Sequence, residues 1–203
     1  MLKSLKLKLS SLLTGSNIGG TSYDYHRFLE LNSIAKGIQA ADMMLKAAEI
    51  RLVSARPSCP GKYQILITGE VSAVESALRT GVESAKANVV DRLLIPRVHP
   101  QVIEAISMSA MPSSLKALGI LEFFSVTGAI IAADAAAKAA SVSLIEIRLG
   151  TGIGGKSFVT FTGDVGAVEE SVEAGAKTAE TNGTLVEKVV IAHPDRELYR
   201  SLL

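Results

Sequence analysis

"FLELNSIAKGIQAADMMLKAA" (residues 28–48) returns later in the chain as "ILEFFSVTGAIIAADAAAKAA" (residues 120–140). Leu-Glu, Ala-Ala-Asp and Lys-Ala-Ala stand at the same places in both stretches. Further along, a Gly-Lys pair, a Thr-Gly-acid-Val segment and a His-Pro pair recur in the same order. Chance does not produce so many ordered matches, so the chain is a tandem duplication. The joint between the two copies lies near residues 108–117.

Each copy predicts the element order β-α-β-β-α-β. A short strand ends at Glu30 or Glu122, and a helix begins beyond Ser33 or Ser125. Two strands around a short loop then indicate a hairpin, and a second helix and a last strand follow. The later strands are expected at residues 50–56, 63–70 and 91–98 in the first copy and at 143–149, 157–164 and 187–193 in the second. This order predicts an α+β fold of sheet and helices, twice over.

Two local patterns refine the helices of the first copy. Ser72, followed three residues later by Glu75, predicts a capping box at the start of the second helix. On the first helix, apolar residues at helical spacing form one stripe. That stripe consists of Ile34, Ile38, Ala41, Leu45 and Ala48.

The composition restricts the function. Hydrophobic residues make up 48% of the 203 residues, but only 4% are aromatic and none is tryptophan, so the core is built mainly from Ala, Val, Ile and Leu. The net charge of +1 offers no basic surface for nucleic acid. The single cysteine excludes an intrachain disulfide framework and fits a reducing cytosol. No uncharged apolar run reaches the roughly 18 residues of a membrane-spanning helix.

Residues 1–22 form a separate segment. Leucines fall on one helical face of "MLKSLKLKLSSLL", with lysines largely opposite, and "TGSNIGGTS" then has the composition of a flexible linker. Lysines interrupt the apolar stretch that a signal peptide needs. The segment is therefore either a poorly ordered tail or a basic amphipathic helix for a membrane surface or a partner protein.

No catalytic set emerges from the sequence. His26, His99 and His193 are not clustered, and no paired carboxylates or Ser/His/Asp set is present. "GTGIGGK" (150–156) is rich in glycine but lies between two predicted strands, whereas a nucleotide-binding fingerprint joins a strand to a helix. The chain is therefore not expected to be an enzyme. The one unusual reactive group is Cys59, in the loop "RPSCPGKY" (56–63).

Three segments and their repeats carry a family resemblance. "LNSIAKGIQAADMMLKAA" (31–48), "TGEVSAVESALRTGVESA" (68–85) and "LIPRVHPQV" (94–102) closely resemble the shell-protein domain of bacterial microcompartments. The resemblance implies two tandem ferredoxin-like shell domains, at 23–110 and 117–203. It also implies a homotrimer that forms a pseudohexameric tile. Such a tile lies beside other shell proteins in a cytoplasmic microcompartment.

Within this family the chain looks most like the iron–sulfur-binding tandem shell proteins of propanediol-utilisation compartments. That resemblance implies a [4Fe-4S] cluster on the trimer axis, held by three copies of Cys59, with electron or cluster transfer across the shell. Redox enzymes in the compartment lumen would then be partners. It also places the pore loops at Ser58, Cys59, Pro60, Gly61 and Lys62 and at Gly152, Ile153, Gly154 and Gly155. Zinc on the same thiolates, or a plain free thiol, are the alternatives for Cys59.

The resemblance assigns three residues to the edges of the tile: Lys46, Lys138 and Arg97. The second copy has no arginine at the position of Arg97. The first strand also departs from the family, because "YDYHRF" (23–28) replaces the Ala-Leu-Gly-Ile that the second copy keeps at 117–120. Tyr and Phe still favour a strand at this place.

Two other functions compete with the redox tile. One keeps the tile but makes its axis a gated pore for metabolites, with Cys59 incidental. The other is a ferredoxin-like regulatory trimer that binds a small effector between subunits.

Overall fold

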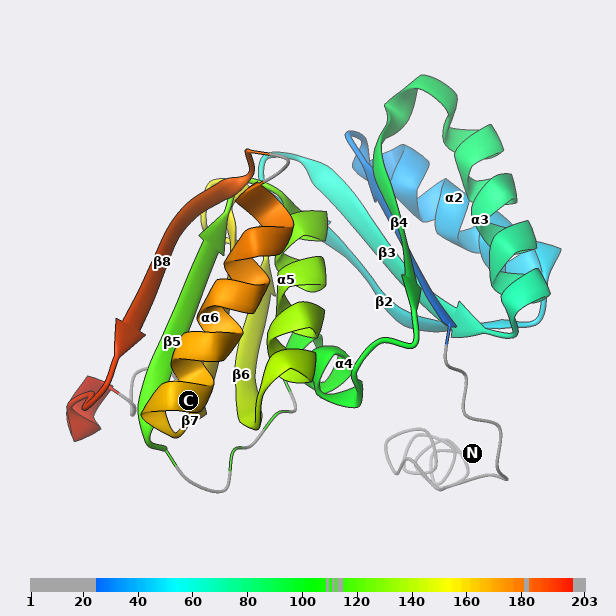
Figure 1. The fold of residues 1–203 in the computed structure, drawn as a ribbon. Coiled ribbons are helices and arrows are strands. Elements are labelled where there is room, and N and C mark those ends of the chain that lie inside the picture. Colours follow the sequence, from blue (N-terminus) through cyan, green and yellow to red (C-terminus); the bar gives the residue numbers. More distant parts are fainter. Residues whose placement is uncertain (1–24, 109, 111, 113–114, 181–182, 199–203) are drawn as a thin grey trace, which may run out of the picture.

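The chain forms two four-stranded antiparallel sheets, each with two long helices on one face (Figure 1). This computed structural model describes residues 25–108, 110, 112, 115–180 and 183–198, so the predicted tail at 1–22 lies outside the described residues. The first half contains β1 (Tyr25–Leu31), α2 (Ile34–Ala47), β2 (Ile50–Ser58), β3 (Lys62–Gly69), α3 (Val71–Ala85), the short 3-10 helix η1 (Lys86–Asn88) and β4 (Val89–Pro96). The second half contains β5 (Ala117–Phe123), α5 (Val126–Ala139), β6 (Val142–Leu149), β7 (Ser157–Gly163), α6 (Val165–Glu180) and β8 (Leu185–Ile191). Helix α4 (Pro100–Ile106) lies between the halves in sequence.

The two sheets have the same topology. Their strand orders are β2-β3-β1-β4 and β6-β7-β5-β8, and all pairs are antiparallel. The predicted order β-α-β-β-α-β and the α+β class are therefore confirmed in both copies. The unusual first strand of the first copy is a central strand, because β1 pairs with β3 on one side and with β4 on the other.

The first helix of each copy begins as predicted. Ser33 and Ser125 are the N-caps, and their hydroxyls accept hydrogen bonds from the backbone N–H groups of Lys36 and Gly128. The predicted capping box at Ser72 is wrong. Helix α3 begins at Val71, after Glu70, so Ser72 lies inside the helix.

The apolar stripe of α2 is buried only in part. The helix buries Gly37, Ala40, Ala41 and Met44 against its own sheet and α3. Three large apolar residues of the stripe point outward and are 42%, 56% and 43% exposed: Ile34, Ile38 and Leu45. The helix is apolar on two faces, and its small residues take the inner one, because Gly37 meets the Tyr63 side chain so closely that a Cβ would lie 2.4 Å from its atoms.

Two large hydrophobic cores hold the molecule together, beside a small cluster of Leu118 and Ile145. One core fills the space between the first sheet and its helices, with Leu29, Ile67 and Met44 fully buried. The other fills the second domain and extends to the opposite face of the first sheet, where Phe28 and Ile95 belong to it. The two halves are thus joined by continuous apolar packing.

Helix α4 occupies the junction between the halves, a position that sequence patterning did not indicate. Its Val102, Ala105 and Ile106 are buried in the shared core. Gln101 bridges to β6, donating to Val142 O at 3.3 Å and accepting from Leu144 N–H at 2.8 Å. The first copy thereby reaches across to the second and fixes its orientation (Figure 1).

Candidate functional site

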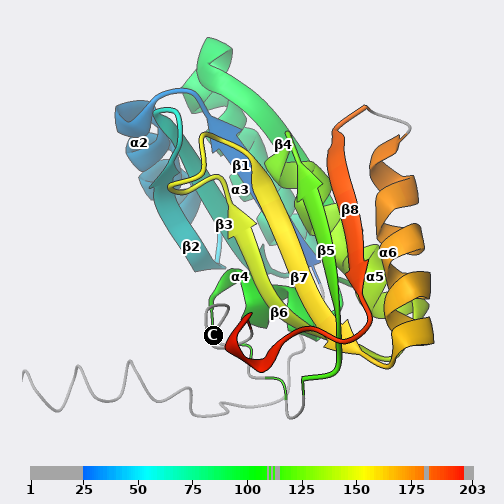
Figure 2. The same ribbon diagram turned by 90° about the vertical axis from the view of Figure 1, so that its left-hand side faces the viewer.

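The two predicted pore loops lie against each other. The β2–β3 loop carries Cys59 and the β6–β7 loop spans 150–156, and Figure 2 shows both at the same end of the two sheets. The backbone N–H of Cys59 donates to Gly150 O at 3.1 Å. Loops far apart in sequence therefore form one surface, to which each domain contributes.

The side chain of Gln64 contacts the start of each loop. Its side chain is 3% exposed, and its Nε2 donates to Ser58 Oγ at 2.9 Å and to Leu149 O at 3.1 Å. Ser58 precedes Cys59, and Leu149 precedes the second loop. One buried amide thus ties the starts of both loops together. Sequence reasoning missed this residue, because a single glutamine in an apolar strand has no motif.

Gly155 lies close to the Cys59 loop. A Cβ at this position would lie 3.1 Å from Pro60 Cδ and 3.2 Å from Cys59 O. Its φ of +85° is also one that residues with side chains rarely adopt. Glycine is therefore required here both for its backbone and for the space beside Cys59.

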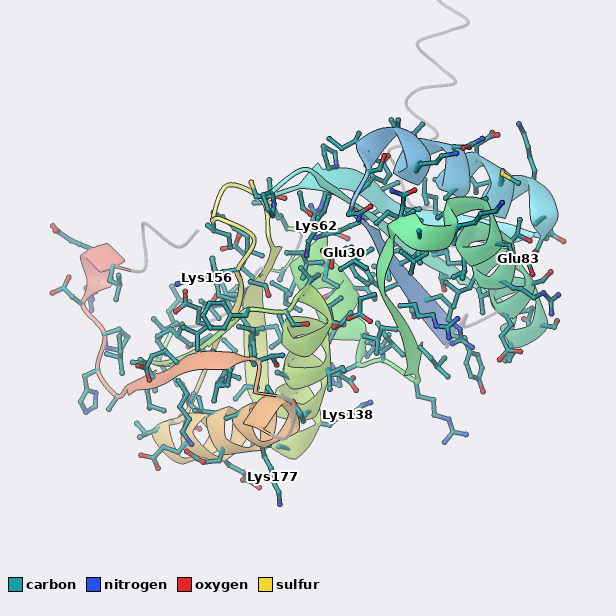
Figure 3. All side chains as sticks on the ribbon, turned by 90° about the horizontal axis from the view of Figure 1, so that it is seen from above. Glu30, Lys62, Glu83, Lys138, Lys156 and Lys177 are labelled. Carbon is teal, nitrogen blue, oxygen red and sulfur yellow. The ribbon has the colours of Figure 1, made fainter. Side chains whose placement is uncertain are left out.

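The repeated Gly-Lys pairs have a structural role in the loops. Lys62 Nζ lies 3.2 Å from Glu30 Oε2, and Lys156 Nζ lies 2.8 Å from Glu122 Oε1 (Figure 3). The repeated Leu-Glu and Gly-Lys signals of the sequence are the two halves of these ion pairs. Because Lys62 is paired with Glu30, which is nearly buried, most of its charge is balanced within its own domain.

Cys59 is a free, half-buried thiol. Among the described residues of one chain, no three His, Cys, Asp or Glu side chains are grouped as a metal site would require. Any cluster on Cys59 must therefore draw ligands from other chains. The described part of the chain also contains no helix long and apolar enough to cross a membrane.

The predicted edge lysines occupy equivalent places in the two domains. Lys46 and Lys138 lie in the last turns of α2 and α5, and each pairs at 2.6 Å with the aspartate four residues earlier. Asp134 also accepts the backbone N–H of His99 at 2.8 Å, which ties α5 to the first domain.

Arg97 has no counterpart in the second copy. It is exposed, with a φ of +49°. In β4 and β8, Ile95 pairs with His26 and Ile191 pairs with Leu118, so these two isoleucines are equivalent. Only Ala192 then separates Ile191 from His193, whereas three residues separate Ile95 from His99. The second copy therefore lacks two residues at this turn, and the structure leaves the edge role of Arg97 a prediction.

Family comparison gives the class of protein that has this fold. The BMC-domain model matches residues 28–98 and 117–194. The chain belongs to the BMC-domain family of bacterial microcompartment shell proteins, with two domains in tandem. Proteins of this family are structural components of the shell and are not enzymes.

Individual relatives agree with this assignment. The bacterial microcompartment shell protein PduT of Citrobacter freundii is 39% identical over 175 residues, which cover 86% of this chain and 95% of that protein. A crystal structure of a microcompartments protein from Desulfitobacterium hafniense superposes with a TM-score of 0.83 at 53% identity, covering 87% of this chain and 98% of the other. The fused permuted hexameric shell protein MSM0275 shares the fold at 18% identity, with a TM-score of 0.55, covering 77% of this chain and 81% of the other.

Proposed function

We propose that three copies of this chain form a pseudohexameric shell tile, with a [4Fe-4S] cluster held on its axis by three Cys59 thiolates. The tile passes electrons or clusters between the two sides of the shell. The domains at 23–110 and 117–203 supply alternate positions around the ring.

One observation carries the trimer: the same helix face is covered in one domain and uncovered in the other. On α5, Ile130 is fully buried because β4 and α4 of the first domain pack over that face. Ile38 is the equivalent residue of α2 and is 56% exposed. The cover that α5 receives from its own chain is missing on α2.

The missing cover is available on a second copy of the chain. In the second domain, β8 stands where β4 stands in the first, and its Val189 is 40% exposed. Its counterpart Leu93 packs into the shared core. Leu52 on β2 of the first domain is also uncovered: it is 38% exposed, while its equivalent Leu144 on β6 is 2% exposed. Domain one of each copy and domain two of the next therefore expose matching apolar faces, and head-to-tail contacts of this kind form a ring when the rotation between copies is about 120°.

The ring supports a site at Cys59. A threefold axis brings three copies of any loop near it to a common point. Each loop carries one thiol, the ligand type that iron–sulfur clusters use. The contacts of Cys59 with Gly150, and of Ser58 with Gln64, hold the loop in a defined position before any ligand binds. When bound, the cluster would supply one-electron chemistry, while the chain supplies the thiolates and a fixed loop.

The rest of the surface serves assembly. Lys46, Lys138 and Arg97 are exposed and would contact neighbouring shell proteins at the tile edges. Redox enzymes inside the compartment are the partners on the lumen side. Neither role requires further catalytic residues in this chain.

Anaerobic reconstitution with iron and sulfide tests the cluster. We expect the wild type to bind one cluster per three chains, with a broad visible absorption band and an EPR signal after reduction by dithionite. Cys59→Ser should remove both signals and leave the trimer intact, because the loop backbone contacts do not use the thiol. Zinc uptake in place of iron, measured by elemental analysis, would favour the zinc alternative.

If wild type and Cys59→Ser take up no metal alike, the cluster is wrong and the axis is better regarded as a metabolite pore. A soluble trimer that forms no sheets or tubes at high concentration, and whose melting temperature responds to a small effector, would instead favour the regulatory trimer.

A further inference from the structure

A groove of about 430 Å³ lies between α3 and the edge strand β4 of the first domain. All of its lining comes from the first domain, from β1, α3 and β4. The lining combines three arginines, two glutamates and an apolar side: Arg27, Arg79, Arg92, Glu75, Glu83, Leu78, Val82 and Leu94. Neither the family resemblance nor the proposed cluster accounts for it.

In the second domain, an ion pair lies at the position that corresponds to the groove. There Lys188 on β8 donates from its Nζ to both carboxylate oxygens of Glu173 on α6, at 2.7 and 2.9 Å. Strand register makes Arg92 the counterpart of Lys188, because Arg92 pairs with Leu29 and Lys188 with Leu121. The repeated Thr-Gly-acid-Val segment makes Arg79 the counterpart of Glu173. The first domain thus places two guanidinium groups where the second has an ion pair.

The floor of the groove also differs between the domains. In the second domain, Phe161 lies over Gly119, where a Cβ would be 2.4 Å from its ring. The same pair in the first domain is Ile67 opposite Arg27. Arg27 is 4% exposed, and its guanidinium pairs with Glu75 at 3.1 Å. The first domain therefore has Ile67 in place of the Phe161 ring, and the buried guanidinium of Arg27 lies beneath the groove.

The remaining charges leave the groove positive. Glu75 is engaged by Arg27, and in the part of the chain that the structure describes, neither Arg79 nor Arg92 has an ion pair. Glu83 is the other carboxylate of the lining, and it stands on α3 where α6 has Lys177 (Figure 3). Three arginines against two glutamates give an excess of one positive charge.

We propose that this groove binds a small organic anion with one phosphate or carboxylate group and a short apolar part. Guanidinium groups bind such planar or tetrahedral anions through paired hydrogen bonds. Arg79 and Arg92 contact the anionic group, and the apolar part lies against Leu78, Val82 and Leu94. The second domain has no such site, because the Glu173–Lys188 pair and Phe161 occupy the corresponding space.

The site remains open in the proposed ring. The contacts between domains use α4, the Phe28 face of the first sheet and the outer face of α5. The groove lies on the other side of β4, towards α3. Its ligand binding is therefore independent of Cys59, and the two proposals can fail separately.

Isothermal titration calorimetry of the full chain with phenyl phosphate tests the site. We expect saturable binding of one phenyl phosphate per chain, and weaker binding of inorganic phosphate and of phenol. Arg79→Glu places a carboxylate opposite Arg92, as the second domain has opposite Lys188, and should weaken binding at least about tenfold. Arg92→Gln should weaken it in the same direction.

Arg51→Glu makes the same charge change on β2, outside the groove, and serves as the matched control. It should leave the affinity for phenyl phosphate within about twofold of the wild type, because the long-range charge effect is screened at moderate salt. Unsaturable binding by the wild type would overturn the site. Equal losses in Arg79→Glu and Arg51→Glu would overturn it too, since general charge would then explain the affinity.

Discussion

Gln64 shows how a single side chain sets the position of the candidate metal ligand. It reaches Ser58 in its own domain and Leu149 in the other, so the Cys59 loop is fixed relative to both domains. The equivalent residue of the second domain is Phe158, so this amide contact is made once per chain. The asymmetry matches the presence of cysteine in only one of the two loops.

Gln64→Leu should therefore loosen the Cys59 loop. The substitution keeps the size of the side chain but leaves Ser58 Oγ and Leu149 O without their buried donor, at a cost of about 1–3 kcal/mol. We expect amide hydrogen exchange in a peptide spanning 52–66 to become at least about tenfold faster. The measurement does not depend on any bound cluster.

Gln101→Leu is the control for this effect. It removes the other glutamine that bridges the two halves, at Val142 and Leu144, far along β6 from the loop. Exchange near Cys59 should then remain at the wild-type rate. Unchanged exchange in Gln64→Leu itself would show that the loop is held by its backbone contacts alone.

At the scale of elements, α2 and α5 show one sequence pattern in two environments. Both helices have a Ser N-cap and an Asp-Lys pair in the last two turns. Only α5 is covered on its outer face, which makes it apolar nearly all round, with seven buried residues. In the trimer that we propose, the exposed face of α2 is a subunit contact.

The pair Ile38→Ser and Ile130→Ser separates assembly from folding. Ile38→Ser should convert the trimer largely to monomer, since a polar group would enter the proposed subunit contact, while the monomer keeps its melting temperature. Ile130→Ser changes the same residue type within the chain, where loss of buried contacts should destabilise folding by about 2–5 kcal/mol. Light scattering coupled to size exclusion gives the mass, and calorimetry gives the melting temperature.

A trimer that survives Ile38→Ser unchanged would contradict the arrangement. So would an Ile130→Ser protein with wild-type stability, since the comparison of the two helices would then have no energetic basis.

The same elements show what sequence patterning could and could not predict. The internal repeat and the hairpin pattern were sufficient to place the strands and the helix starts at Ser33 and Ser125. Periodicity detected the apolar stripe of α2 but could not show which of its residues face the core of the domain. The predicted cap at Ser72 was wrong because the helix begins at Val71, with Glu70 in the N-cap position. At the candidate site, Gln64 and the groove arginines depend on long-range contacts that have no local signal.

At the scale of the whole molecule, the joint between the copies is part of the fold. Helix α4 belongs to the first copy by sequence, yet its Ile106 and Val102 are buried in the core of the second domain. His99 and Gln101 bind α5 and β6 through their backbone and side chain. The two halves therefore share their stability.

This sharing predicts that the chain unfolds in one cooperative transition, although it has two domains. Ile106→Ala should lower the free energy of unfolding by about 2–5 kcal/mol, because it opens a cavity in a core that both sheets line. Calorimetry at fixed protein concentration should show a single shifted peak. Hydrogen exchange in β3 and in β7 should accelerate together, since a coupled pair of domains loses protection through the same global opening. Two resolved transitions, with only β7 losing protection, would show instead that the halves fold independently and that α4 serves the second domain alone.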